Sequence, residues 1–108
     1  MGAFISKQIE MYELDYSLAI QKIQDKYNSI FTIKYEVVTN KEKTCGITYY
    51  MSKATIIVVI RDNVRTYSTY DKSINCEESV RLALKNSLRE LVSDRFLYYG
   101  LIDNRRIV

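Results

Sequence analysis

The chain has no proline, histidine or tryptophan, and only three of its 108 residues are glycine. So little proline and glycine excludes collagen-like, proline-rich and other low-complexity classes. Without histidine, no side chain has an ordinary pKa near neutrality. A nucleophile would therefore lack its usual base, and no glycine-rich phosphate loop is present. The sequence predicts that the protein is not an enzyme.

Cysteine is also scarce, because Cys45 and Cys76 are the only two. Two cysteines do not make a disulfide framework, so we expect two reduced, partly buried thiols. Without histidine they also fall short of the four ligands of a structural zinc site. The sequence predicts no metal and no cofactor.

Long apolar runs are missing too. The longest, residues 54–60, is far shorter than the roughly 20 residues that span a bilayer. No secretory signal is recognisable, and we expect a cytoplasmic protein (in the host cytoplasm if it is viral) with no transmembrane segment. The start Met1-Gly2-Ala3-Phe4-Ile5-Ser6 fits the N-myristoylation pattern, with Gly2 as acceptor. Membrane association is expected only if Gly2 is acylated; such a short pattern also arises by chance.

The residues that are present suit a globular fold. Apolar residues make up 47% and charged residues 27%, so we expect one folded domain over residues 1–100 and a tail over 101–108. Apolar residues at spacings of three and four predict a long amphipathic helix over residues 5–28. Its stripe is Ile9, Tyr12, Tyr16, Ile20, Ile23 and Tyr27, widened by Met11, Leu14 and Leu18.

The period then changes to two, which predicts strands. Residues 31–38 alternate, residues 40–43 read as a polar turn, and residues 47–61 are β-prone. Ser52-Lys53 leaves open whether 47–61 is one bent strand or two short ones. The β-branched run 55–60 suggests a central strand covered on both faces or nearly so. Asp62-Asn63 signals a hairpin into a strand over 64–70.

A second helix is predicted from Cys76, with Asn75 as N-cap and Glu78 placed as in a capping box. Its apolar stripe is Val80, Ala83, Leu84, Leu88, Leu91 and Val92, and residues 96–99 extend it to Gly100. The order predicts the α+β class. The expected architecture is an αβββα sandwich whose three- or four-stranded antiparallel sheet has two helices packed on one face.

This layout resembles the double-stranded RNA-binding domain over residues 14–92. Residues 18–24 lie where that family's first helix carries Leu-x-x-Glu-x-x-Gln, with Gln21 replacing the Glu and Gln24 matching. Residues 35–38, Tyr-Glu-Val-Val, resemble the family's first strand. Residues 56–70 resemble its strand–turn–strand, and residues 83–88 resemble the Ala-Ala-Lys-x-Ala-Leu stretch of its second helix. The resemblance implies a fold and a capacity to bind double-stranded RNA.

Two departures bear on that function. The family's second helix opens with a Lys-Lys-x-Ala-Lys cluster that grips phosphates, whereas residues 76–80 read Cys-Glu-Glu-Ser-Val. The family's Gly-Pro-x-His loop signal is also missing. Fold alone does not carry function.

Basic and aromatic side chains supply the candidate binding residues, although a net charge of +3 is too small to name a partner. Around the two hairpins, a basic patch would form if the sheet brings together Lys41, Lys43, Lys53, Arg61 and Arg65. Arg81 and Lys85, followed by Arg89, share one helix face that could follow a phosphate backbone. Of the ten tyrosines, Tyr67 and Tyr70 are the expected partner contacts. The alternatives are a solvated helix face, strand-edge lysines that discourage aggregation, and half-buried strand tyrosines.

Two functions of different classes remain. One is a small interaction protein, a viral- or phage-type inhibitor or adaptor that binds a host protein machine. The other is an atypical double-stranded RNA-binding module. Acids at the start of the second helix oppose phosphate and favour the first function. A homodimer through an exposed strand edge is a further expectation.

Overall fold

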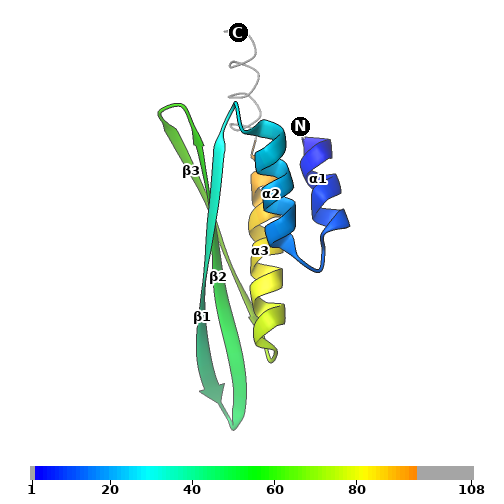
Figure 1. The fold of residues 1–108 in the computed structure, drawn as a ribbon. Coiled ribbons are helices and arrows are strands. Elements are labelled where there is room, and N and C mark those ends of the chain that lie inside the picture. Colours follow the sequence, from blue (N-terminus) through cyan, green and yellow to red (C-terminus); the bar gives the residue numbers. More distant parts are fainter. Residues whose placement is uncertain (1, 95–108) are drawn as a thin grey trace.

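The computed structural model describes residues 2–94, which form an α+β fold with all helices on one side of a three-stranded sheet (Figure 1). The elements are α1 (Gly2–Met11), α2 (Tyr16–Tyr27), β1 (Thr32–Thr44), β2 (Ile47–Ile60), β3 (Asn63–Ser73) and α3 (Cys76–Ser93). The predicted fold class is confirmed, with one helix more than expected. The predicted tail and Gly100 stop lie outside the described residues.

The sheet is an antiparallel meander in the order β1-β2-β3. β1 and β2 are joined by Cys45 and Gly46, which both have positive φ, at 52° and 78°. Such a two-residue turn suits the right-handed twist of the strands. The predicted polar turn at 40–43 is wrong, because these residues continue β1 and pair with residues 48–51. Glycine at position 46 supplies the turn conformation that residues 40–43 lack.

The second hairpin turns at Arg61 and Asp62, one residue before the predicted site. Arg61 takes the positive φ, at 55°. Residues 47–60 form one continuous strand, so the sheet formed by the described residues has three strands rather than four.

Burial on β2 alternates with a period of two. The even residues Ser52, Ala54, Ile56, Val58 and Ile60 are buried beneath the helices, and the odd residues between them are only half-buried or exposed. The strand was expected to be covered on both faces or nearly so. That expectation is wrong, because the helices cover one face alone (Figure 1).

α3 lies close against β2 and β3 because the contacting side chains are small. Ser79, Ala83 and Ser87 recur every four residues along the helix and are all buried. The Ser79 hydroxyl shares a 2.8 Å hydrogen bond with the Ser52 hydroxyl, and the Ser87 hydroxyl donates to the carbonyl of Ala54 at 2.9 Å. These bonds satisfy polar groups that would otherwise be costly to bury.

The start of α3 agrees with the predicted cap in part. The Asn75 side chain accepts a hydrogen bond from the Glu78 backbone N–H at 3.1 Å. The reciprocal bond of a capping box is missing, because the Asn75 N–H donates to the Ser73 hydroxyl instead. The helix ends at Ser93, with Asp94 extended. The predicted extension over residues 96–99 lies outside the described part.

The predicted helix over 5–28 is two helices, which corrects the sequence interpretation. Asp15 interrupts it, because its carboxylate accepts the N–H of Ser17 at 3.1 Å and starts α2 as an N-cap. The predicted stripe is buried on both pieces except at Tyr12, which is half-buried. The residues that were expected to widen the stripe are exposed, because the break at residues 12–15 changes the phase of the helix. They are Met11, Leu14 and Leu18.

α1 packs on α2 and α3 and completes the core. Ile5 and Ile9 are its buried residues. An aromatic cluster secures the far end of α2, where Tyr27 meets Phe4 edge-on at 5.9 Å and stacks on Phe31 at 5.3 Å. Such pairs add about 0.5–1.5 kcal/mol beyond the area that they bury.

We expect Ile20→Ala to lower the free energy of unfolding by about 2–4 kcal/mol, since Ile20 lies in the core and truncation leaves a cavity. Chemical denaturation measures this, with Gln21→Ala on the exposed side of α2 as the control. A loss below about 0.5 kcal/mol would show that Ile20 is not buried.

We also expect Ala83→Leu to destabilise the fold by about 1–3 kcal/mol, because the added atoms push α3 away from β2 and β3. Arg89→Leu adds an apolar side chain at an exposed position of the same helix and should have a small effect. Equal stability of the two variants in urea would contradict close packing at Ala83.

Candidate interaction surface

The sheet face opposite the helices is uncovered within the described residues (Figure 1). Directly paired residues of antiparallel strands share a face. Lys53 on β2 pairs with Val38 of β1 and Tyr70 of β3, and Met51 pairs with Lys72. All of these side chains therefore lie on the uncovered face, since their β2 partners are odd-numbered.

Two lysine–tyrosine pairs stand on this face. The Lys53 Nζ lies 5.6 Å from the ring centre of Tyr70, and the Lys72 Nζ lies 4.6 Å from that of Tyr49. Both distances fit cation–π contacts. Tyr70 is 61% exposed, so its ring remains open to a ligand. We define the uncovered patch as Val38, Tyr49, Met51, Lys53, Tyr70 and Lys72.

The uncovered patch combines aromatic, apolar and basic groups. The side chain of Val38 is 56% exposed and lies beside Lys53. An isolated β-branched side chain gains no stability from contact with water. Rigid tyrosines with neighbouring apolar side chains are typical of interface cores. The patch also carries two positive charges, and Glu36 and Glu42 flank it on the same face, since they pair with Thr55 and Tyr49. The chemistry on offer is therefore recognition of acidic groups opposite Lys53 and Lys72, within a face of mixed charge.

The structure does not bring the predicted hairpin residues into one basic patch. Lys41 and Lys43 pair with even-numbered β2 residues, and so lie on the helix side of the β1–β2 hairpin. That hairpin projects past the start of α3 (Figure 1). Arg61 lies in the loop at the other end of β2. Ile60 lies twelve positions beyond Thr48, the partner of Lys43, which is about 40 Å along the strand.

Arg65 and Lys53 are also apart, because they lie on opposite faces of the sheet. Arg65 pairs with the buried Val58, which places it on the helix side. On the uncovered face, the predicted sheet residues that meet are therefore Lys53 and Tyr70.

On α3, Arg81 makes a contact within the molecule. Its guanidinium donates to the carbonyl of Glu13 at 3.4 Å and lies near the buried Tyr16, whose hydroxyl makes no hydrogen bond within residues 2–94. Burial raises the pKa of Tyr16, and the positive charge of Arg81 opposes part of that rise. Arg81 thus helps to hold the α1–α2 turn against α3. Lys85, four residues on, is half-buried.

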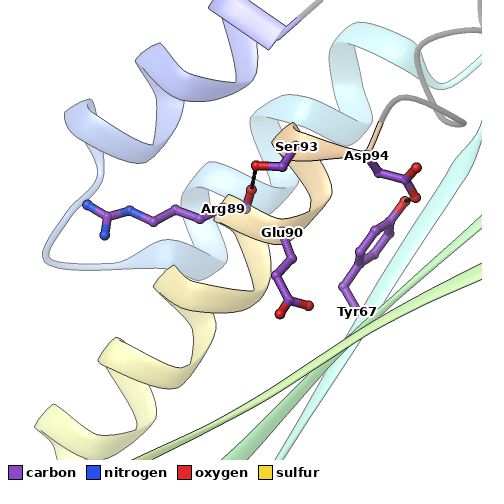
Figure 2. A pocket seen from close by; sticks show the side chains of 5 residues that line it. All are labelled: Tyr67, Arg89, Glu90, Ser93 and Asp94. Atoms are coloured by element: carbon purple, nitrogen blue, oxygen red, sulfur yellow. Dashed lines mark hydrogen bonds between the residues drawn. The ribbon is translucent and has the colours of Figure 1, made fainter.

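Tyr67 was expected to contact a partner, and this prediction is wrong. Its side chain points toward α3, is only 6% exposed and belongs to the core. Its hydroxyl donates to the Asp94 carboxylate at 2.5 Å (Figure 2). It differs from Tyr70 because three residues along a strand place the side chains on opposite faces. The hollow around this pair is lined also by Arg89, Glu90 and Ser93.

The positions matched to the RNA-binding family have local partners. The Gln24 side chain donates to the carbonyl of Phe31 at 2.9 Å and accepts the N–H of Ile33 at 2.6 Å. It therefore ties α2 to the start of β1. Glu77 and Glu78 are exposed in the first turn of α3, where carboxylates stabilise the helix and repel phosphate.

Both cysteines are free and exposed, Cys45 in the hairpin turn and Cys76 at the start of α3. The expectation of partly buried thiols is wrong, because both residues lie at ends of elements rather than in their packed middles.

Sequence reasoning missed Val38, Met51 and Lys72 and did not single out Tyr49 as a partner contact. The available signal was the alternation along each strand. That signal assigns a face only after the pairing register is known, and the register depended on a turn placed five residues too early.

Comparison of the chain with protein-family models, curated proteins and solved structures gives no match. Among residues 2–94, no helix is both long and apolar enough to cross a bilayer. The resemblance to the double-stranded RNA-binding domain stays a prediction.

We expect Tyr67→Phe to cost about 1–2 kcal/mol at neutral pH, because it removes a hydrogen bond to a carboxylate. Burial and the bond to Asp94 raise the pKa of Tyr67 above its ordinary value of 10.0. Above pH 10 the unfolded tyrosine loses its proton while the folded one keeps it, so this contribution to stability falls. The gap in unfolding free energy between wild type and variant should therefore narrow from pH 9 to pH 11. A constant gap would contradict the assignment.

Proposed function

We propose that the protein is a small protein-binding module, of the inhibitor or adaptor kind, which docks a partner protein on the uncovered patch. The observation that supports this most is the pair of lysine–tyrosine contacts beside the exposed Val38 on a sheet face that no described helix covers. The partner surface has an apolar centre with acidic groups opposite Lys53 and Lys72, because such charges complement the two lysines of the patch.

The geometry gives double-stranded RNA less support. Binding a phosphate backbone depends on several cations spaced along one surface. Here Lys41 and Lys43 lie far from Arg61, and Glu77 and Glu78 occupy the matched helix start. Binding of a partner protein on the uncovered patch does not depend on any of these cations.

Site-specific photocrosslinking tests the proposal. A p-benzoylphenylalanine at position 70 should capture a partner protein other than this chain in extracts of the native host, whereas the same group at position 35 should not. Tyr35 is a matched control, since it is exposed on an outer strand but lies on the helix side of the sheet. The captured protein is then identified and purified, and its affinity for each variant is measured.

For that purified partner, Tyr70→Ala should weaken binding more than tenfold, as expected of an aromatic anchor. Lys53→Ala should weaken it less, with a stronger effect at low salt. Tyr35→Ala and Lys41→Ala with Lys43→Ala should leave it unchanged.

The RNA arm uses a short RNA duplex at low and moderate salt. Binding that falls steeply with salt, and that Lys41→Ala with Lys43→Ala abolishes, would overturn the proposal in favour of RNA recognition. Equal capture at positions 70 and 35 would also overturn it.

A further inference from the structure

Among residues 2–94, β1 is an outer strand of the sheet, with β2 on one side only. Its 13 residues form the longer of the two sheet edges, since β3 has 11. An outer strand presents unpaired N–H and C=O groups, which favour pairing with another strand.

The alternation of hydrogen bonds identifies which residues face outward. A two-residue hairpin closes on a hydrogen-bonded pair, here Thr44 with Ile47. Pairs then alternate, so the even residues of β1 bond to β2 and the odd residues direct their backbone groups outward. The 2.6 Å bond from the Ile33 N–H to the Gln24 side chain agrees, because Ile33 is odd.

The sequence of β1 is complementary to itself about Val38. If a second copy pairs antiparallel with residue 38 on the two-fold axis, residue 34 lies opposite residue 42. Lys34 then faces Glu42 of the second copy, and by symmetry Glu42 faces Lys34. Between these two ion pairs the opposed residues are Tyr35 with Lys41, Glu36 with Asn40, Val37 with Thr39, and Val38 with itself; beyond them Ile33 faces Lys43 and Thr32 faces Thr44.

This register also satisfies the backbone. Odd residues oppose odd residues, so the outward N–H and C=O groups of residues 35–41 in the two copies meet, while the N–H of Ile33 keeps its bond to Gln24. Faces are preserved, because residues of equal parity on β1 share one side of the sheet. Two other registers oppose like charges. With the two-fold axis at Thr39, Glu36 lies opposite Glu42 of the second copy, and with the axis at Glu36, that residue lies opposite itself. An axis at Val37 leaves Lys34 against Asn40, with no ion pair.

The β3 edge is less suited. The outward-facing N–H of Lys72 is already taken by the Asp71 carboxylate at 2.8 Å. An axis at Ser68 would oppose Arg65 with Asp71, but that carboxylate also accepts the Asn86 side chain at 3.0 Å. Pairing through β3 would have to disturb both bonds.

We propose that two copies of this chain associate through β1, antiparallel and with the two-fold axis at Val38. The dimer joins the three strands of each copy into one continuous sheet, with the helices of both on the same side. The uncovered patches, each of which includes Val38, become neighbours. The proposal is independent of the partner that this face binds.

Cysteine crosslinking tests the register. In a background with Cys45→Ser and Cys76→Ser, Val38→Cys places two thiols at a non-hydrogen-bonded pair. The Cα atoms of such a pair lie about 4.5 Å apart, within the range of a disulfide. Val38→Cys should form a disulfide dimer under mild oxidation at least tenfold faster than Ser68→Cys, which reports pairing through β3. A faster reaction of Ser68→Cys, or equal rates, would overturn the proposal.

A charge swap tests the ion pairs, and both residues are exposed, so the fold tolerates it. Lys34→Glu and Glu42→Lys should each raise the dimer dissociation constant at least tenfold, measured by sedimentation, because each opposes like charges twice. The double variant should restore it to within about threefold. A wild-type chain that remains monomeric at 200 μM overturns the proposal, as does a double variant no better than either single one.

Discussion

The close approach of α3 to the sheet is the contact on which the rest of the structure depends. Ala83 and the two buried serines present almost no side-chain bulk to β2, so the helix backbone comes near enough for hydroxyl groups to bridge the layers. Thr69 reinforces this from β3, because its hydroxyl donates to the carbonyl of Ala83 at 2.7 Å and lies 2.8 Å from the Ser87 hydroxyl. Larger residues would gain apolar burial but lose these bonds and the spacing. The helix therefore fixes which face of β2 is the inside.

That choice determines the candidate surface. Because the even residues of β2 are packed under the helices, the odd residues and their partners on β1 and β3 form the other face. Lys53, Tyr70 and Lys72 come from two strands, and no stretch of sequence contains them together. The same geometry directs Tyr67 inward, where a carboxylate satisfies its hydroxyl. Two tyrosines three residues apart thus have opposite roles.

Period and composition predicted the element types well. The stripes on α2 and α3, the N-cap at Asn75 and the alternation along β2 all follow from local sequence, and the α+β class follows from their order. Polarity misled at residues 40–43. Lysine, glutamate and asparagine look like a turn, yet a strand that projects past the helices is solvated on both sides and can carry them. The break at Asp15 was missed because the apolar spacing continues across it, and only the N-cap chemistry marks it. The face of each candidate residue depends on register, which long-range pairing sets.

The two edges of the sheet differ in how their unpaired backbone groups are satisfied. On β3, Asp71 folds back onto the next backbone N–H, so part of that edge is satisfied within the chain. On β1, Gln24 does the same at Ile33, but the strand then continues for eleven residues beyond it. Its charges alternate in sign around an apolar centre at Val38. Lysines alone would repel any approaching strand, whereas Lys34 and Glu42, placed symmetrically, repel most sequences and match their own. Charge on this edge can therefore provide both solubility and selectivity for a second copy.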